Sequence, residues 1–214
     1  ITSCDWMRSD VVWTFAIAIV FLGLSAALFG HWLEKAGPRK AGVAAAIFWG
    51  GGLMVTSLGV SLHQLWLIWL GAGVIGGIGL GLGYISPVST LIKWFPDRRG
   101  LATGMAIMGF GGGAMIGMPL GDYLIKANGV GETFFIMGLI YLFAMTIGAF
   151  GYRVPAEGWK PKGWNPVAKK TNHMISSSHV HVSKAHKTPQ FWLLWGVLCL
   201  NVSAGIGVLS VAKP

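Results

Sequence analysis

Two short stretches of this chain gather acidic and basic side chains at close spacing, and the first is GHWLEKAGPRKAG at residues 30 to 42. Its glycines and charged residues of interest are Gly30, Glu34, Lys35, Gly37, Arg39 and Lys40. A glycine lets two helices come close, and an acid among several bases forms ion pairs that can hold two surfaces together and then release them. The alternative is a basic turn that only orients the chain in a membrane. We name residues 30–42 the first charged turn.

The second stretch is KWFPDRRGLATG at residues 93 to 104, which we name the second charged turn. We expect Pro96 to end the preceding helix, because proline cannot continue a helical hydrogen-bond ladder. Asp97 can cap the next helix or pair with a base, and Arg98 and Arg99 hold the turn on one side of a membrane.

Neutral polar side chains in apolar surroundings form a second group of candidates. The hydroxyl of Tyr84 can donate to a carboxylate in a cavity, or it can bond a backbone carbonyl while the ring packs between helices. Asn201 can face a pathway or bond a neighbouring helix.

Four histidines, which would be metal ligands at regular spacing, are His173, His179, His181 and His186. Their spacing is irregular, and no cysteine or acid completes a coordination shell, so we expect no metal site.

The composition indicates what kind of elements carry these residues. Of all residues, 54% are hydrophobic and 11% are charged, and the mean hydropathy is +0.64. These values are typical of a membrane protein. Six apolar runs cover residues 11–32, 41–61, 65–92, 101–125, 132–152 and 190–212. Each run has the ~20 residues that span a bilayer as a helix, and none alternates with the period of a strand. The predicted fold class is therefore all-α, a polytopic transmembrane helix bundle.

The basic residues predict the orientation of this bundle. Residues 33–40, 93–100 and 153–189 carry 13 of the 16 lysines and arginines, all on one side if the runs cross in succession. By the positive-inside rule that side is the cytoplasm. Topology thus explains the net charge of +9, and no nucleic-acid partner is expected, because few aromatic residues accompany these charges.

The spacing in the first charged turn resembles the cytoplasmic signature of the major facilitator superfamily, Gly-x-x-x-Asp-Arg/Lys-x-Gly before a basic pair. Glu34 stands in the usual aspartate place, and Pro38 is inserted before the pair. GYISPVSTLIKWFPDRRGLATGMAIMGFGGGA at residues 83–114 and TPQFWLLW at residues 188–195 closely resemble the oxalate/formate antiporter branch.

This resemblance implies a fragment with helices two to seven of twelve. Residues 1–152 would form a partial N-terminal bundle, residues 153–189 a cytoplasmic linker, and residues 190–214 the first helix of a C-terminal bundle. The sequence begins without a methionine, which fits that expectation.

The resemblance also implies alternating-access transport of a small carboxylate, by antiport or with proton coupling, with no cofactor and no covalent chemistry. It places the protein as a monomer in a bacterial plasma membrane. The expected pathway residues are Tyr84, Asn201, Phe110 and Val12. Phe110 and Val12 stand where oxalate transporters have polar side chains, which favours a monocarboxylate. A membrane-embedded enzyme and a channel are the alternatives, and neither has a clustered set of ionisable residues or a filter motif here.

Overall fold

The structure is a computed structural model that describes residues 6–156, 158–161 and 182–211. The chain divides into two compact units, residues 1–164 and residues 165–214. The helices of the first unit are α1 (Arg8–Ala36), α2 (Pro38–Ser61), α3 (Leu65–Ile68), the π-helix η1 (Trp69–Ile75), α4 (Gly76–Trp94), α5 (Arg99–Asn128) and α6 (Val130–Gly151). The second unit, described by itself, has α7 (Val182–Ala185) and α8 (Pro189–Val211).

Five helical stretches are long and apolar enough to cross a membrane: α1, α2, the continuous stretch Leu65–Trp94, α5 and α6. They correspond to the first five predicted runs, so the predicted all-helical membrane fold is confirmed for this part. The sixth run, predicted at residues 190–212, forms α8. Three of the four candidate metal-ligating histidines, at positions 173, 179 and 181, lie outside the described residues. Within the described part, no group of three His, Cys, Asp or Glu residues could hold a metal ion.

Both charged turns are shorter than the loops predicted from the sequence. Only Gly37 separates α1 from α2, so the charged residues between the first two apolar runs belong to helix ends. The backbone of Gly37 has a φ of 84°, which glycine adopts without strain, and Pro38 fits the first position of a helix because it has no N–H to satisfy. In the second turn, α4 continues to Trp94 and α5 begins at Arg99.

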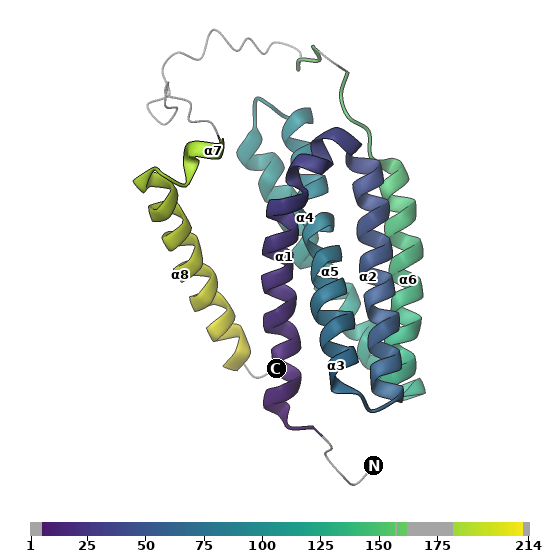
Figure 1. Cartoon of the computed structure of the whole chain (residues 1–214). Coiled ribbons are helices and arrows are strands. Elements are labelled where there is room, and N and C mark those ends of the chain that lie inside the picture. Colours follow the sequence, from purple (N-terminus) through teal and green to yellow (C-terminus); the bar gives the residue numbers. More distant parts are fainter. Residues whose placement is uncertain (1–5, 157, 162–181, 212–214) are drawn as a thin grey trace. The chain divides into compact units, whose positions relative to one another are not determined.

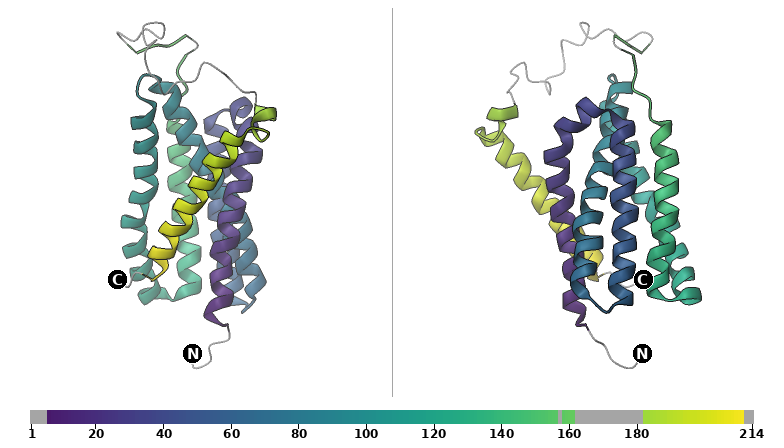
Figure 2. Two further views of the ribbon diagram at one scale, coloured as in Figure 1. Left: turned by 90° about the vertical axis from the view of Figure 1, so that its left-hand side faces the viewer. Right: turned by 45° about the vertical axis from the view of Figure 1, so that its right-hand side comes forward.

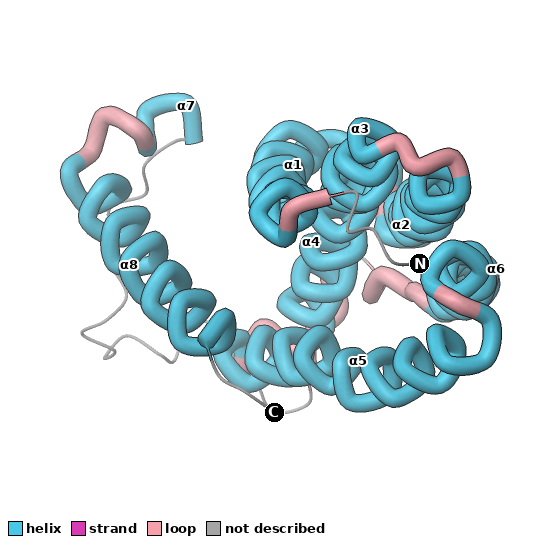
Figure 3. Tube along the Cα trace, turned by 90° about the horizontal axis from the view of Figure 1, so that it is seen from below, coloured by secondary structure: helices cyan, strands magenta, loops and turns pink. Residues whose placement is uncertain are grey.

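Helix α4 lies among the other helices of the first unit and contacts α1, α2 and α5, as the view along the helices shows (Figure 3). Helices α2 and α6 pack side by side along their length (Figures 1 and 2). A Cβ atom on Gly50 of α2 would lie 2.8 Å from the carbonyl oxygen of Gly138 on α6. The two helices can come this close because glycine has no side chain. Such close packing is expected in a membrane, where the hydrophobic effect does not drive helices together.

Glycines spaced by four residues in η1 and α4 also allow close packing, whereas those in α5 do so only in part. Gly73, Gly77 and Gly81 each face α1, and a Cβ atom on Gly77 would lie 2.7 Å from the carbonyl oxygen of Ala18. In α5, by contrast, Gly109 and Gly113 have no neighbouring atom within 4 Å of an added Cβ. Part of the glycine face of α5 therefore borders open space.

The π-helix η1 was not expected from the sequence. It places Gly71 directly against α2, where a Cβ atom would lie 2.6 Å from both the carbonyl oxygen of Gly52 and the hydroxyl of Thr56. At the other side of η1, the indole N–H of Trp69 donates to the carbonyl of Asp10 at 3.0 Å. A sequence of apolar residues and glycines does not show whether a helix has π or α hydrogen bonds, because the same side chains are compatible with either.

Most of the described basic residues of the first unit lie at one end of its helices, whereas Arg8 and Lys126 lie at the other end. The hydroxyl of Ser86 donates to the carbonyl of Pro38, and Arg39 donates to the carbonyl of Tyr152, which joins the ends of α4, α2 and α6. The opposite end carries a hydrogen bond from Ser57 to the carbonyl of Gly131.

This arrangement predicts the sidedness of the chain. In a cysteine-free background, single cysteines at the exposed positions Lys160 and Asn128 should react from opposite faces of sealed vesicles, with Lys160 on the cytoplasmic face, because the positive-inside rule places the basic end there. A membrane-impermeant maleimide, added before and after permeabilisation, measures this. Labelling of both cysteines from the outside would contradict the orientation.

Candidate functional site

The charged residues of the first turn lie in the last turn of α1 and the first turn of α2. Glu34, Lys35, Arg39 and Lys40 are all exposed, whereas Gly30 is half-buried. An added Cβ on Gly30 would meet only the Cδ1 of Ile85 at 3.7 Å, an ordinary contact. Within the described residues, the ion pairs are Arg98–Asp97 and Lys126–Asp122, so Glu34 is not part of an ion pair there. The acid of this turn therefore faces outward from the unit.

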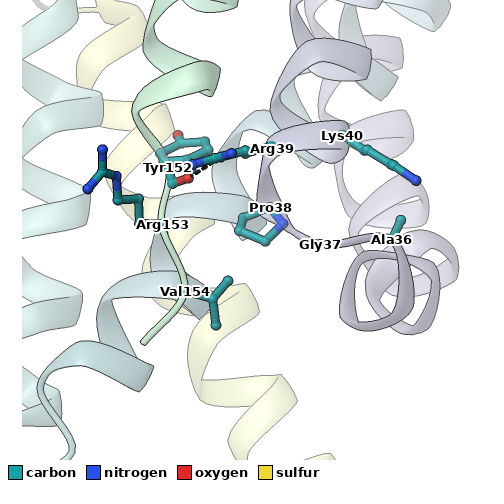
Figure 4. Close-up of a pocket in the computed structure, with 8 residues that line it drawn as sticks. All are labelled: Ala36, Gly37, Pro38, Arg39, Lys40, Tyr152, Arg153 and Val154. Atoms are coloured by element: carbon teal, nitrogen blue, oxygen red, sulfur yellow. Dashed lines mark hydrogen bonds between the residues drawn. The ribbon is translucent and has the colours of Figure 1, made fainter. Parts of the chain in front are cut away.

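Arg39 has a defined partner at the end of α6. Its Nε–H donates to the carbonyl oxygen of Tyr152 at 2.6 Å (Figure 4). The two residues border a cavity of about 530 Å³ that is also lined by Gly37, Lys40 and Arg153. In Figure 4 the side chains of Lys40 and Arg153 point away from each other, so the three cations do not converge on one point. Burial raises the pKa of the Tyr152 phenol, which stays neutral at physiological pH.

The second charged turn contains a close pair and one unpartnered oxygen. Arg98 Nε lies 3.7 Å from Asp97 Oδ2, whereas Asp97 Oδ1 is buried with no hydrogen-bond partner. Helix α5 begins at Arg99, which is exposed, and no side chain caps its N-terminus. Of the two roles predicted for Asp97, the structure therefore has pairing and not capping.

Tyr84 borders a cavity between helices. This cavity has a volume of about 410 Å³ and is lined by residues of α2, α4, α5 and α6: Trp49, Gly79, Leu80, Gly83, Tyr84, Gly109, Gly113, Tyr141 and Met145. A second cavity of about 290 Å³ continues along α4 and α5 and shares Gly83, Tyr84 and Gly109 with it. None of the described residues that line these two cavities is charged, so a bound anion would meet aromatic rings and neutral donors here.

The other predicted pathway residues lie on three different helices, α1, α5 and α8. Val12 lies near the beginning of α1 and is 58% exposed, and it lines neither cavity. Phe110 follows the cavity residue Gly109 in α5, but its side chain lies outside the described part. Asn201 is exposed on α8 in the second unit.

Two cavity residues were missed from the sequence, Trp49 and Tyr141. Their rings contact each other edge to face, with centroids 6.2 Å apart. The signal available in the sequence was weak, because α2 and α6 are apolar on all sides and their composition does not show which face meets α4.

The position of the first charged turn gives an expected result for Gly30. Gly30→Leu should leave expression largely intact, because an added Cβ meets only an ordinary contact, but it should slow exchange strongly in the complete protein if this surface closes against another part during turnover. Counterflow in proteoliposomes measures the rate, and Gly51→Leu, at an open position of α2, is the control. Unchanged exchange would mean that Gly30 has no role in closure.

Comparison with known proteins agrees with this architecture. The profile of the Major Facilitator Superfamily matches residues 4–212. The chain is 28% identical over 205 residues to the uncharacterized MFS-type transporter YhjX of Escherichia coli, covering 96% of this chain and 48% of that protein. It is 30% identical over 189 residues to the oxalate:formate antiporter of Oxalobacter formigenes, covering 86% and 40%. It is 34% identical over 115 residues to apicoplast pyruvate carrier 1 of Toxoplasma gondii, covering 52% and 20%.

The chain spans about half the length, or less, of these relatives. The family match extends over nearly all of its residues, including both charged turns, the membrane helices and α8. The resemblance inferred from the two turns is therefore confirmed at the level of the family, and the chain is a multi-pass membrane protein that belongs to the Major Facilitator Superfamily.

Proposed function

We propose that the complete protein is a secondary active transporter of small carboxylates that works by alternating access, within the oxalate/formate branch of its family. The observation that carries this proposal is the family match over residues 4–212, together with relatives named as an oxalate:formate antiporter, a pyruvate carrier and a monocarboxylate transporter. Transport is favoured over an enzyme for the same reason, since these relatives are named for transport and not for catalysis.

The charge distribution supports a substrate pathway whose neutral part comes from this chain and whose charged part comes from elsewhere in the complete protein. A carboxylate away from water is costly unless a cation or several donors meet it. The described lysines and arginines of the first unit lie at or near helix ends, and none of the described residues that line the Tyr84 cavity is charged. The cation that pairs with the substrate is therefore proposed to come from a part of the complete protein outside this chain.

The lining of the cavity supports a monocarboxylate in preference to oxalate. A dicarboxylate needs donors at both ends, whereas a monocarboxylate tolerates apolar walls at one end. The hydroxyls of Tyr84 and Tyr141 and the indole of Trp49 are donors, and Leu80 and Met145 are apolar walls. Val12 does not line this cavity, so the argument rests on these residues and on Phe110. We propose exchange for another anion, or coupling to a proton, in a bacterial plasma membrane.

Competitive uptake into proteoliposomes that hold the complete protein tests this proposal. Formate and short 2-oxo or 2-hydroxy acids should compete for uptake more strongly than oxalate does. Phe110→Tyr should shift the preference toward oxalate, because it restores a polar side chain at a position where the resemblance gives oxalate transporters one. Phe143→Tyr, at a 64% exposed position of α6, is the matched control.

The possible results test the substrate preference and the substrate class separately. Oxalate outcompeting every monocarboxylate in the unaltered protein would overturn the substrate preference and leave carboxylate transport in place. Absence of uptake for all carboxylates, in a preparation that is folded and correctly inserted, would overturn the proposed substrate class.

A further inference from the structure

The backbone that leaves α6 receives contacts from two other helices. From the start of α2, Arg39 donates its Nε–H to the carbonyl of Tyr152 at 2.6 Å. From the end of α4, Trp94 donates its indole N–H to the carbonyl of Arg153 at 2.7 Å. These carbonyls follow the last turn of α6, where backbone acceptors have no partner within the helix and need donors from elsewhere. Each receives one from a different charged turn.

Aromatic side chains add contacts on either side of these hydrogen bonds. The rings of Trp94 and Trp159 meet edge to face with centroids 5.1 Å apart. The ring of Tyr152 packs against α2 at Gly42, where an added Cβ would lie 3.0 Å from Cε2 of the tyrosine. Residues 152 to 159 are thus attached at both ends of the stretch, through Tyr152 and Trp159.

The two donors are themselves held in place. The hydroxyl of Ser86, a fully buried residue of α4, donates to the carbonyl of Pro38, next to Arg39. This bond ties the start of α2 to α4, the same helix that carries Trp94. The helices that carry the two donors, α2 and α4, are therefore bonded to each other.

We propose that Arg39 and Trp94 are positioning residues that fasten the backbone of Tyr152 and Arg153 to the first helical unit, so that the chain leaving α6 moves with that unit. The two charged turns then have a shared task in addition to their charge: each supplies one donor to the chain as it leaves α6. The proposal does not depend on the identity of the substrate.

Hydrogen–deuterium exchange of the full chain in nanodiscs tests the proposal, read on peptides that cover residues 152–160. Arg39→Leu and Trp94→Phe each remove a donor, and the phenylalanine keeps an aromatic ring against Trp159. Each variant should speed amide exchange in these peptides by about 10-fold, the effect of losing one hydrogen bond that holds a segment closed. Lys40→Leu and Trp13→Phe are matched controls, because no described hydrogen bond involves either side chain and both residues are exposed.

The result that overturns the proposal is equal exchange in the two donor variants and their controls. A second measurement covers the case in which a donor variant loses stability throughout. A nitroxide at Lys160, in a chain whose Cys4 and Cys199 are serine, should give the spectrum of a restricted label in the otherwise unaltered protein. A freely rotating label at Lys160 would show that the stretch is not fastened, whatever the variants do.

Discussion

Gly52→Ala should lower the free energy of unfolding of the helical bundle by about 2–3 kcal/mol, a large effect for the addition of one methyl group. The added Cβ would lie 2.6 Å from the carbonyl oxygen of Gly71 and 2.8 Å from the backbone nitrogen of Gly76. Both neighbours are backbone atoms, which cannot rotate away as a side chain can. The crossing of α2 with η1 and α4 must therefore widen.

The neighbouring glycine provides the control for this prediction. Gly51→Ala adds the same methyl group to the same helix, at a position with no other atom within 4 Å of the Cβ. It should be neutral or stabilise the helix by up to about 1 kcal/mol, because alanine has the better helix propensity. Unfolding by sodium dodecyl sulfate in mixed micelles, followed by tryptophan fluorescence, measures both variants. Equal stability of the two would show that the close crossing at Gly52 is wrong.

The second large effect concerns the cavity. Tyr84→Phe should reduce kcat/KM for carboxylate uptake by about 10- to 100-fold in the complete protein, because a hydrogen bond to a charged group contributes about 1.5–3 kcal/mol. The variant keeps the ring that lines both cavities, so the change isolates the hydroxyl.

Tyr123→Phe is the matched control, because this tyrosine of α5 is 70% exposed and lines no described cavity near Tyr84. Thermal unfolding of both variants separates a loss of recognition from a loss of folding. If Tyr84→Phe transports carboxylates as well as the unaltered protein while its unfolding temperature is also unchanged, Tyr84 has only a packing role.

The sequence was sufficient for the class of fold and for the gathering of charge at one end. A bilayer cannot solvate backbone N–H and C=O groups, so apolar runs of this length must be helices wherever they cross, and their number and order can be read directly. The basic residues at Lys35, Arg39 and Arg98 follow a rule that depends only on their position relative to those runs. The spacing of charges and glycine in the first turn was sufficient to identify the family only together with residues 83–114 and 188–195.

The tertiary structure decided which faces of these helices meet. Helices α2 and α6 are apolar on every side, so neither has a polar face that would reveal its inward side, and Trp49 and Tyr141 could not be assigned to the cavity of Tyr84.

The contacts at the end of α6 depend on the fold in the same way. Arg39 and Trp94 lie far apart in the sequence, and each has its acceptor in the backbone of residues 152 and 153. Backbone carbonyls are the same in every residue and leave no mark in a sequence. Only the packing of α2 and α4 against α6 brings these donors to the two carbonyls that need them.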